Sequence, residues 1–197
     1  MKITALAALV LVAGAGAGAS AARLKEPIPK DAMETVQVCS DETADYITNS
    51  QARSIARQMF AGIGVGIDWR RAGSCPAGAL RISYSTSTAG GLMPGALAYS
   101  LPYEGTHIVI FYDRVRATVV DPRAFVVLLG HVMTHEITHV LEGVASHSAE
   151  GVMKAHWSGA DYSRMCRKPL PFGDEDVALI HRGLENRAAR RTAGGGE

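Results

Sequence analysis

Two histidines and a glutamate stand at the spacing of a metal site, in the run His135-Glu136-Ile137-Thr138-His139. Residues four apart lie on the same face of a helix, so His135 and His139 can present two imidazoles to a single ion. Glu136 projects beside them and can reach a water on that ion without binding the metal itself. The run therefore predicts two zinc ligands and a general base.

A third histidine follows at a distance that lets the chain fold back. His147 comes after Gly143, a residue that can end the helix and turn the chain. Three imidazoles leave the fourth position of tetrahedral zinc to water, as in catalytic sites, whereas structural sites use four protein ligands. We therefore expect one catalytic Zn²⁺ on His135, His139 and His147. His156 stays open as a substitute ligand or hydrogen-bond donor, the alternative being that it only lines the cleft.

His131 lies one turn before His135 on the same expected helix. A ligand at this position would be ~12 Å from His139 along the axis, at ~1.5 Å per residue, which is too far for one shared ion. We interpret His131 as a histidine of the helix face.

The ligands require a long helix, and the sequence predicts one over 122–141. Asp121 is a suitable N-cap, Pro122 suits the first helical position, and Gly143 follows the last apolar residue. Apolar spacing predicts another helix over 43–61, and Asp174 with its acidic neighbours caps a last one. The segment 153–165 has no regular pattern.

Alternation of apolar and polar residues predicts strands over 35–39, 65–69 and 80–84. A nearly continuous apolar run over 106–112 is typical of a strand buried on both faces. A short strand over 96–101, bounded by Pro94 and Pro102, belongs at a sheet edge. These elements predict a single α+β domain over 35–191. In it a twisted mixed sheet carries both helices, a small C-terminal part closes the cleft from below, and 192–197 form a disordered tail.

The composition is that of a globular chain without a strong overall electrostatic field. The 197 residues include 20 Lys+Arg and 19 Asp+Glu, for a formal net charge of +1, and 47% are hydrophobic. This near balance of basic and acidic residues gives no large overall positive charge that would attract nucleic acid or an acidic membrane surface. We expect a monomer that binds a peptide or protein substrate, without a nucleic-acid partner.

The first residues have the pattern of a secretory signal peptide. Lys2 precedes an apolar stretch over 3–13, and Ala19-Ser20-Ala21 fits a small-x-small cleavage site. We predict a signal peptide over 1–21, an exposed leader over 22–34, and a secreted or periplasmic protein that is not held in a membrane after cleavage. A single membrane anchor is the alternative.

Export would place the three cysteines in an oxidising compartment, where an odd count leaves at least one thiol unpaired. Cys39 and Cys75 each follow a predicted strand. If those strands are parallel neighbours, both cysteines lie at the same end of the sheet, which favours a disulfide between them. Cys166 is then expected to be buried or inert.

Together, the run from His135 to His139, Gly143, the pair His147-Ser148 and the pair Val152-Met153 resemble the metzincin zinc metallopeptidases, most of all the matrixin branch. Short exported bacterial proteins of metzincin type are similar as well. The resemblance implies three histidine ligands, Glu136 as general base, Gly143 as the turn and Met153 as the Met-turn beneath the site. Three residues, where the family has two, separate Gly143 from each flanking histidine.

The resulting hypothesis is a secreted zinc-dependent endopeptidase, in which a metal-activated water attacks the peptide bond. If the resemblance holds, an extended substrate would add to the edge strand at Leu97, Ala98 and Tyr99. Two alternatives remain open. One is a zinc-binding module without turnover, and the other is a zinc hydrolase that acts on a non-peptide amide such as cell-wall material.

Overall fold

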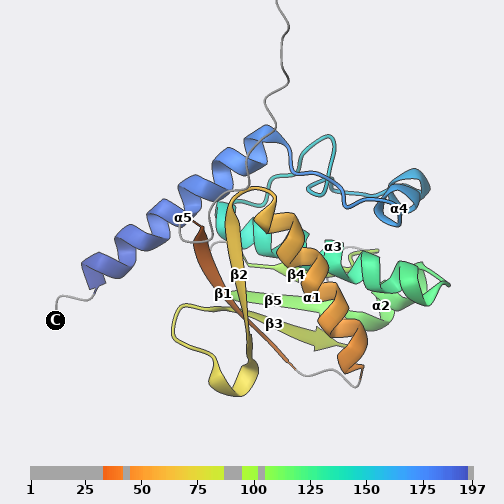
Figure 1. The fold of residues 1–197 in the computed structure, drawn as a ribbon, viewed down its shortest axis with the longest axis horizontal. Helices are drawn as coiled ribbons and strands as arrows, with labels where there is room; N and C mark the ends of the chain where they lie inside the picture. Colours follow the sequence, from red (N-terminus) through yellow and green to blue (C-terminus); the bar gives the residue numbers. More distant parts are fainter. Residues whose placement is uncertain (1–32, 42–44, 87–94, 102–104, 195–197) are drawn as a thin grey trace, which may run out of the picture.

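The computed structural model describes residues 33–41, 45–86, 95–101 and 105–194, and it contains one five-stranded sheet. The strand order is β2-β1-β3-β5-β4 (Figure 1). Four strands are parallel, and β4 pairs antiparallel with β5 at the edge. The strands are β1 (Glu34–Ser40), β2 (Val65–Arg71), β3 (Leu80–Ser85), β4 (Ala98–Ser100) and β5 (His107–Phe111).

Helices follow the strands in an order that resembles the predicted one. They are α1 (Tyr46–Ala61), the 3-10 helix η2 (Ala72–Ser74), α2 (Tyr112–Thr118), α3 (Pro122–Glu142), α4 (Gly159–Met165) and α5 (Asp174–Gly194). The short helices α2 and α4 were not expected from the sequence. Helix α5 continues to Gly194, beyond Thr192, where the tail was expected to begin. The predicted signal peptide and most of the leader lie outside the described residues.

One face of the sheet is buried, because apolar residues alternate along the strands. Val38, Leu80, Ile82, Ile108 and Ile110 are each at most 1% exposed and belong to a single core cluster. The expectation that β5 is buried on both faces is wrong. His107 is exposed and Val109 is only half-buried, because alternate residues of a strand point to opposite faces and these two point away from the face on which α1 and α3 pack.

Helices α1 and α3 pack against each other on this buried face (Figure 1). Asp121 caps α3 by accepting a hydrogen bond from the Arg123 amide, with Pro122 in the first turn, as predicted. The helix is long and apolar enough to cross a membrane, but 78% of that stretch is buried inside the protein. Among the described residues it is the one helix of this kind, and its burial fits a core helix.

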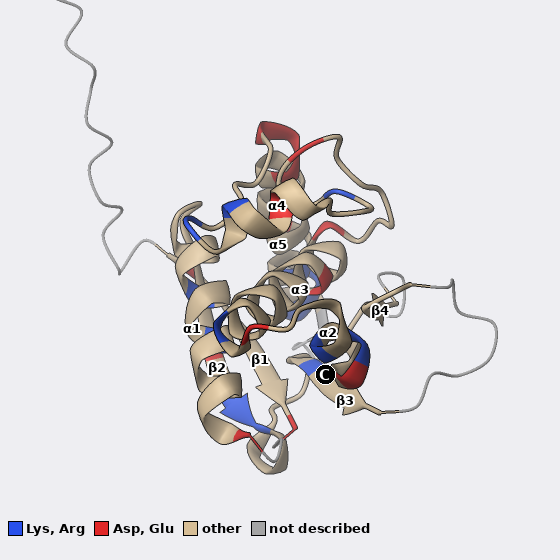
Figure 2. Ribbon diagram, turned by 90° about the vertical axis from the view of Figure 1, so that its right-hand side faces the viewer, with Lys and Arg blue, Asp and Glu red and all other residues tan. Residues whose placement is uncertain are grey.

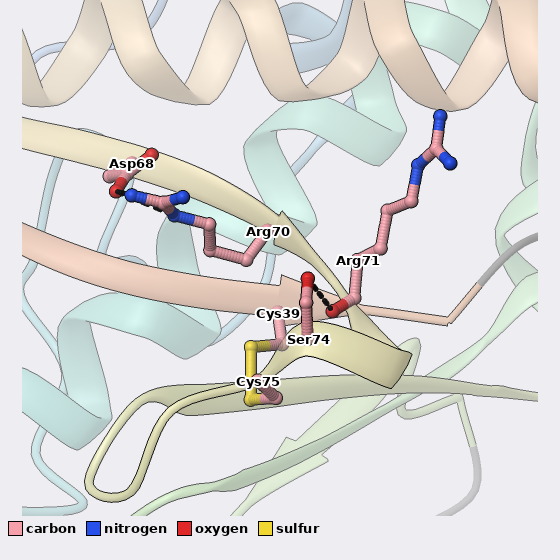
Figure 3. The surroundings of a disulfide bond; sticks show 6 residues. All are labelled: Cys39, Asp68, Arg70, Arg71, Ser74 and Cys75. Carbon is pink, nitrogen blue, oxygen red and sulfur yellow. Dashed lines mark hydrogen bonds and ion pairs between the residues drawn. A yellow bond between two sulfur atoms is a disulfide. The ribbon is translucent and has the colours of Figure 1, made fainter.

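A disulfide joins Cys39 and Cys75, as predicted (Figure 3). Cys39 lies in β1, which pairs in parallel with β2, and Cys75 follows the turn of η2 that leads out of β2. Parallel pairing therefore brings both cysteines to one end of the sheet. Cys166 is free and exposed at the end of α4, so of the two expectations for it, a buried or an inert thiol, burial is wrong.

Candidate active site

Helix α3 and the loop after it bring three imidazoles to one point. The Nε2 atoms of His135 and His139 lie 3.0 Å apart, and those of His139 and His147 lie 3.3 Å apart. Among the described residues, these three histidines have ligand atoms all within 4.8 Å of one another. The predicted set is therefore assembled, including His147 despite its longer spacing.

Backbone carbonyls fix which nitrogen of each ring faces the shared point. His135 Nδ1 lies 2.9 Å from the Val152 carbonyl oxygen, and His139 Nδ1 lies 3.2 Å from that of Val144. A carbonyl oxygen only accepts hydrogen bonds, so the Nδ1 atoms of His135 and His139 must carry the ring hydrogen. The Nε2 atom of each neutral ring then bears a lone pair. Such outer hydrogen bonds orient histidines that bind metals.

This arrangement fits a zinc ion. Two nitrogen lone pairs at 3.0 Å repel each other unless a positive charge lies between them. Nitrogen ligands of tetrahedral zinc at ~2.0–2.1 Å from the ion are themselves about 3.3 Å apart. The separations between His139 and the other two histidines are close to this value, so the three histidines could hold a metal ion.

The turn at Gly143 allows His147 to reach the other two histidines. Gly143 has φ 72° and ends α3 in the left-handed conformation, which glycine adopts without strain. The extra residue before Gly143 lengthens the helix to Glu142, and the extra residue after it lies in an exposed loop. The next residue, Ser148, donates a 2.5 Å hydrogen bond to the buried carboxylate of Asp176 in α5. The ligand loop is thereby held against α5, whose first turn is acidic (Figure 2).

Burial sets the protonation of the three histidines. Burial, and to a lesser extent the neighbouring His139 ring, lowers the pKa of His135 to about 3. Burial and the His147 ring lower the pKa of His139 to about 4. The pKa of His147 is also lowered, by burial and by His156. The imidazoles are therefore kept in the neutral form that binds a metal.

Glu136 is buried in the same cleft as these histidines. Burial raises the pKa of its carboxyl to about 7, and a side-chain hydrogen bond with Ser100 of the edge strand acts in the opposite direction. A general base is most effective when its pKa lies near the working pH. The surroundings of Glu136 therefore suit the role predicted for it.

The histidines lie in a cleft of about 550 Å³ beside β4. The lining includes the expected edge residues Leu97, Ala98 and Tyr99, and also His156 and Trp157. The backbone amides of Phe111 and Leu101 donate to the carbonyl oxygens of Leu97 and His107. In an antiparallel ladder of this register, the N–H and C=O groups of Ala98 point away from β5, on a side of β4 where no further strand pairs among the described residues.

The structure places the remaining predicted residues as follows. Met153 is buried at 1% exposure, directly after Val152, whose carbonyl holds His135. His156 is exposed on the cleft wall, and the structure does not bring it into the cluster of three histidines. His131 is buried on α3 and lies outside the cluster of three histidines, in agreement with its exclusion as a ligand.

Sequence reasoning did not identify several residues that support the site. Ser100 reaches Glu136 from the edge strand, Trp157 packs edge-on against His135 at 5.6 Å between ring centres, and Asp176 holds Ser148. Each comes from a segment distant from α3, so no local spacing signals it. Asp176 alone had a signal, as part of the acidic cap of the last helix.

The fold has a counterpart among solved structures. The chain is similar to archaemetzincin from Methanopyrus kandleri, known from a crystal structure at 1.5 Å, with a TM-score of 0.54 and 15% sequence identity. The similarity covers 80% of this chain and 99% of that chain. At this identity the likeness shows the fold, which agrees with the predicted mixed α+β architecture. Comparisons with family models and with curated proteins find no match.

Proposed function

We propose that this protein is a zinc-dependent endopeptidase. The observation that carries the proposal is the convergence of three Nε2 atoms beside the buried carboxyl of Glu136, in a cleft bordered by β4, the outermost of the described strands. A structural metal site needs no carboxylate beside the ion, so Glu136 favours an enzyme over a zinc-binding module. Archaemetzincin-like architecture supports the same class.

His135, His139 and His147 would hold the zinc. When bound, the ion supplies a Lewis acid that lowers the pKa of a water to roughly 7 and polarises the scissile carbonyl. Glu136 removes a proton from the attacking water and then delivers it to the leaving amine nitrogen, so the proton count balances over the hydrolysis. No covalent intermediate with the protein forms in this scheme.

The edge strand β4 would orient the substrate. An extended peptide can add to the outward N–H and C=O groups of Ala98 as a further strand, which brings its backbone alongside Glu136 and the histidines. The turn at Met153 would support the ligands from below, as the metzincin resemblance implies. We also propose secretion, which the Cys39–Cys75 disulfide favours because disulfides persist outside the cytosol.

Cleavage of an unbiased peptide library by the zinc-loaded protein tests the proposal. Glu136→Gln should keep the zinc and lose about 10²–10⁴-fold in kcat/KM, since it removes the base but keeps the shape of the side chain. Glu150→Gln makes the same chemical change at an exposed position and should leave cleavage unchanged. The proposal would be contradicted if the wild type cleaved no peptide bond, or if Glu136→Gln cleaved as well as Glu150→Gln.

A further inference from the structure

We propose that His131 is a positioning residue of the metal site, which acts on His135 through the segment around Leu170 and the turn around Val152. The inference rests on the proposed zinc site and concerns how the first ligand is held. His131 is neither a ligand nor in contact with the substrate cleft.

Both ring nitrogens of His131 are already engaged. The side chain is fully buried, and Nδ1 lies 2.7 Å from the carbonyl oxygen of Val127, one turn back on α3. Nε2 accepts a 3.1 Å hydrogen bond from the amide of Leu170. Nδ1 must therefore carry the hydrogen, and the neutral ring bridges α3 to the segment that precedes α5.

From Leu170 the connection runs on to a predicted zinc ligand. The carbonyl of the next residue, Pro171, accepts a 2.9 Å hydrogen bond from the Val152 amide. The Val152 carbonyl in turn accepts the hydrogen of His135 Nδ1 at 2.9 Å. His131 thus holds the segment of Leu170 and Pro171 in place. This segment fixes the position of Val152, whose carbonyl orients His135.

Two further contacts tighten this connection. Gly151 has φ 77°, and a Cβ atom at this position would lie 2.3 Å from the Pro171 carbonyl oxygen, so only glycine allows the two segments to approach this closely. The Trp157 ring packs edge-on against both histidines, with ring centres 6.4 Å from His131 and 5.6 Å from His135. Hydrogen bonds and packing therefore link the same two rings.

Substitutions that imitate one ring nitrogen at a time test the inference. The amide of Gln can reach the position of Nε2 and accept from Leu170, whereas the shorter Asn can imitate only Nδ1. We expect His131→Asn to weaken zinc binding about 10-fold, the lower end of the effect of outer hydrogen bonds, and to shift the visible spectrum of the cobalt-loaded protein. His131→Gln should bind zinc within about twofold of the wild type.

Asn49→Ala is the matched control for stability. Asn49 is buried and accepts a 2.7 Å hydrogen bond from the Tyr84 hydroxyl, remote from the path through Leu170. The substitution Asn49→Ala should lower the melting temperature of the protein without changing its affinity for zinc. Equal zinc affinity in His131→Asn and the wild type would overturn the inference, and so would an equal loss in Asn49→Ala. Absence of zinc binding in the wild type would instead contradict the proposed function, and this inference with it.

A measurement on the wild type covers the case in which His131 variants do not fold. Coupling is reciprocal, so zinc that orders His135 must also stabilise the hydrogen bonds that lead to His131. Zinc loading should slow hydrogen exchange at the amides of Val152 and Leu170. Unchanged exchange at Leu170 would overturn the inference.

Discussion

At the scale of single residues, Glu136 and Glu142 lie six positions apart on α3, and their different surroundings indicate different roles. Burial raises the pKa of Glu136 to about 7, and Ser100 of the edge strand is its hydrogen-bonding neighbour. Burial raises the pKa of Glu142 to about 8, with added repulsion from Asp176 and Glu175 of α5. Glu136 therefore belongs to the cleft, and Glu142 to the junction with α5.

The position of Glu142 predicts a dependence of stability on pH. Its folded-state pKa of about 8 lies above the ordinary value of 4.5, so the stability that the neutral carboxyl contributes is fully present below pH 4.5 and is lost as the pH rises from there to about 8. The melting temperature of metal-free protein should therefore fall between about pH 5 and pH 8 and change little from this cause above pH 8. The melting temperature of Glu142→Gln should fall less over the same range. Parallel curves for the two proteins in thermal denaturation would contradict this assignment.

Local spacing was enough to predict that His135, Glu136 and His139 come together at one site, because they share one helix whose geometry is fixed. It was not enough for Ser100, Trp157 or the Val152 carbonyl. These groups meet α3 through tertiary packing, which no spacing encodes. His131 was excluded as a ligand on distance, but its hydrogen bond to Leu170 could not be foreseen.

At the scale of elements, strong periodicity predicted the long helices and the strands better than the short helical segments. Helix α3 begins and ends where its capping residues indicate, at Asp121 and Gly143. Helix α4 has seven residues and a polar sequence, so its hydrophobic pattern is weak. Its signal was the capping box of Ser158 and Asp161, in which each side chain binds the backbone of the other.

The edge strand leads to a test of how substrate binds. Ala98→Pro removes an N–H that faces away from β5, so the sheet should remain intact while one hydrogen bond to a peptide is lost. The expected loss in kcat/KM for peptides is about tenfold, with unchanged zinc content. Ala98→Val keeps the N–H and serves as control. Equal losses in the two variants would argue against strand addition.

At the scale of the whole molecule, the sheet, α1 and α3 form one core, and α5 closes it by packing on the end of α3. The mixed sheet and the disulfide were predicted from the sequence, and the disulfide depended on the correct parallel pairing of β1 with β2. The burial of β5 was not predicted correctly. An apolar run shows that a strand is near the core, but not whether both of its faces are covered.

The disulfide should contribute substantially to the stability of this core. It closes a loop between residues 36 apart, for which the loss of chain entropy in the unfolded state predicts about 3–4 kcal/mol. Reduction of Cys166→Ser protein, which lacks the free thiol, should lower the melting temperature by roughly 10 °C. An unchanged melting temperature, with reduction verified by thiol titration, would contradict this expectation.

The zinc content of the purified protein tests the central claim most directly. We expect one zinc per chain in the wild type by elemental analysis after dialysis, because three Nε2 atoms converge on one point. His147→Ala removes the ligand with the stretched spacing and should lose the zinc or bind it much more weakly. Stoichiometric zinc retained in His147→Ala, or no zinc in the wild type, would contradict the three-histidine site.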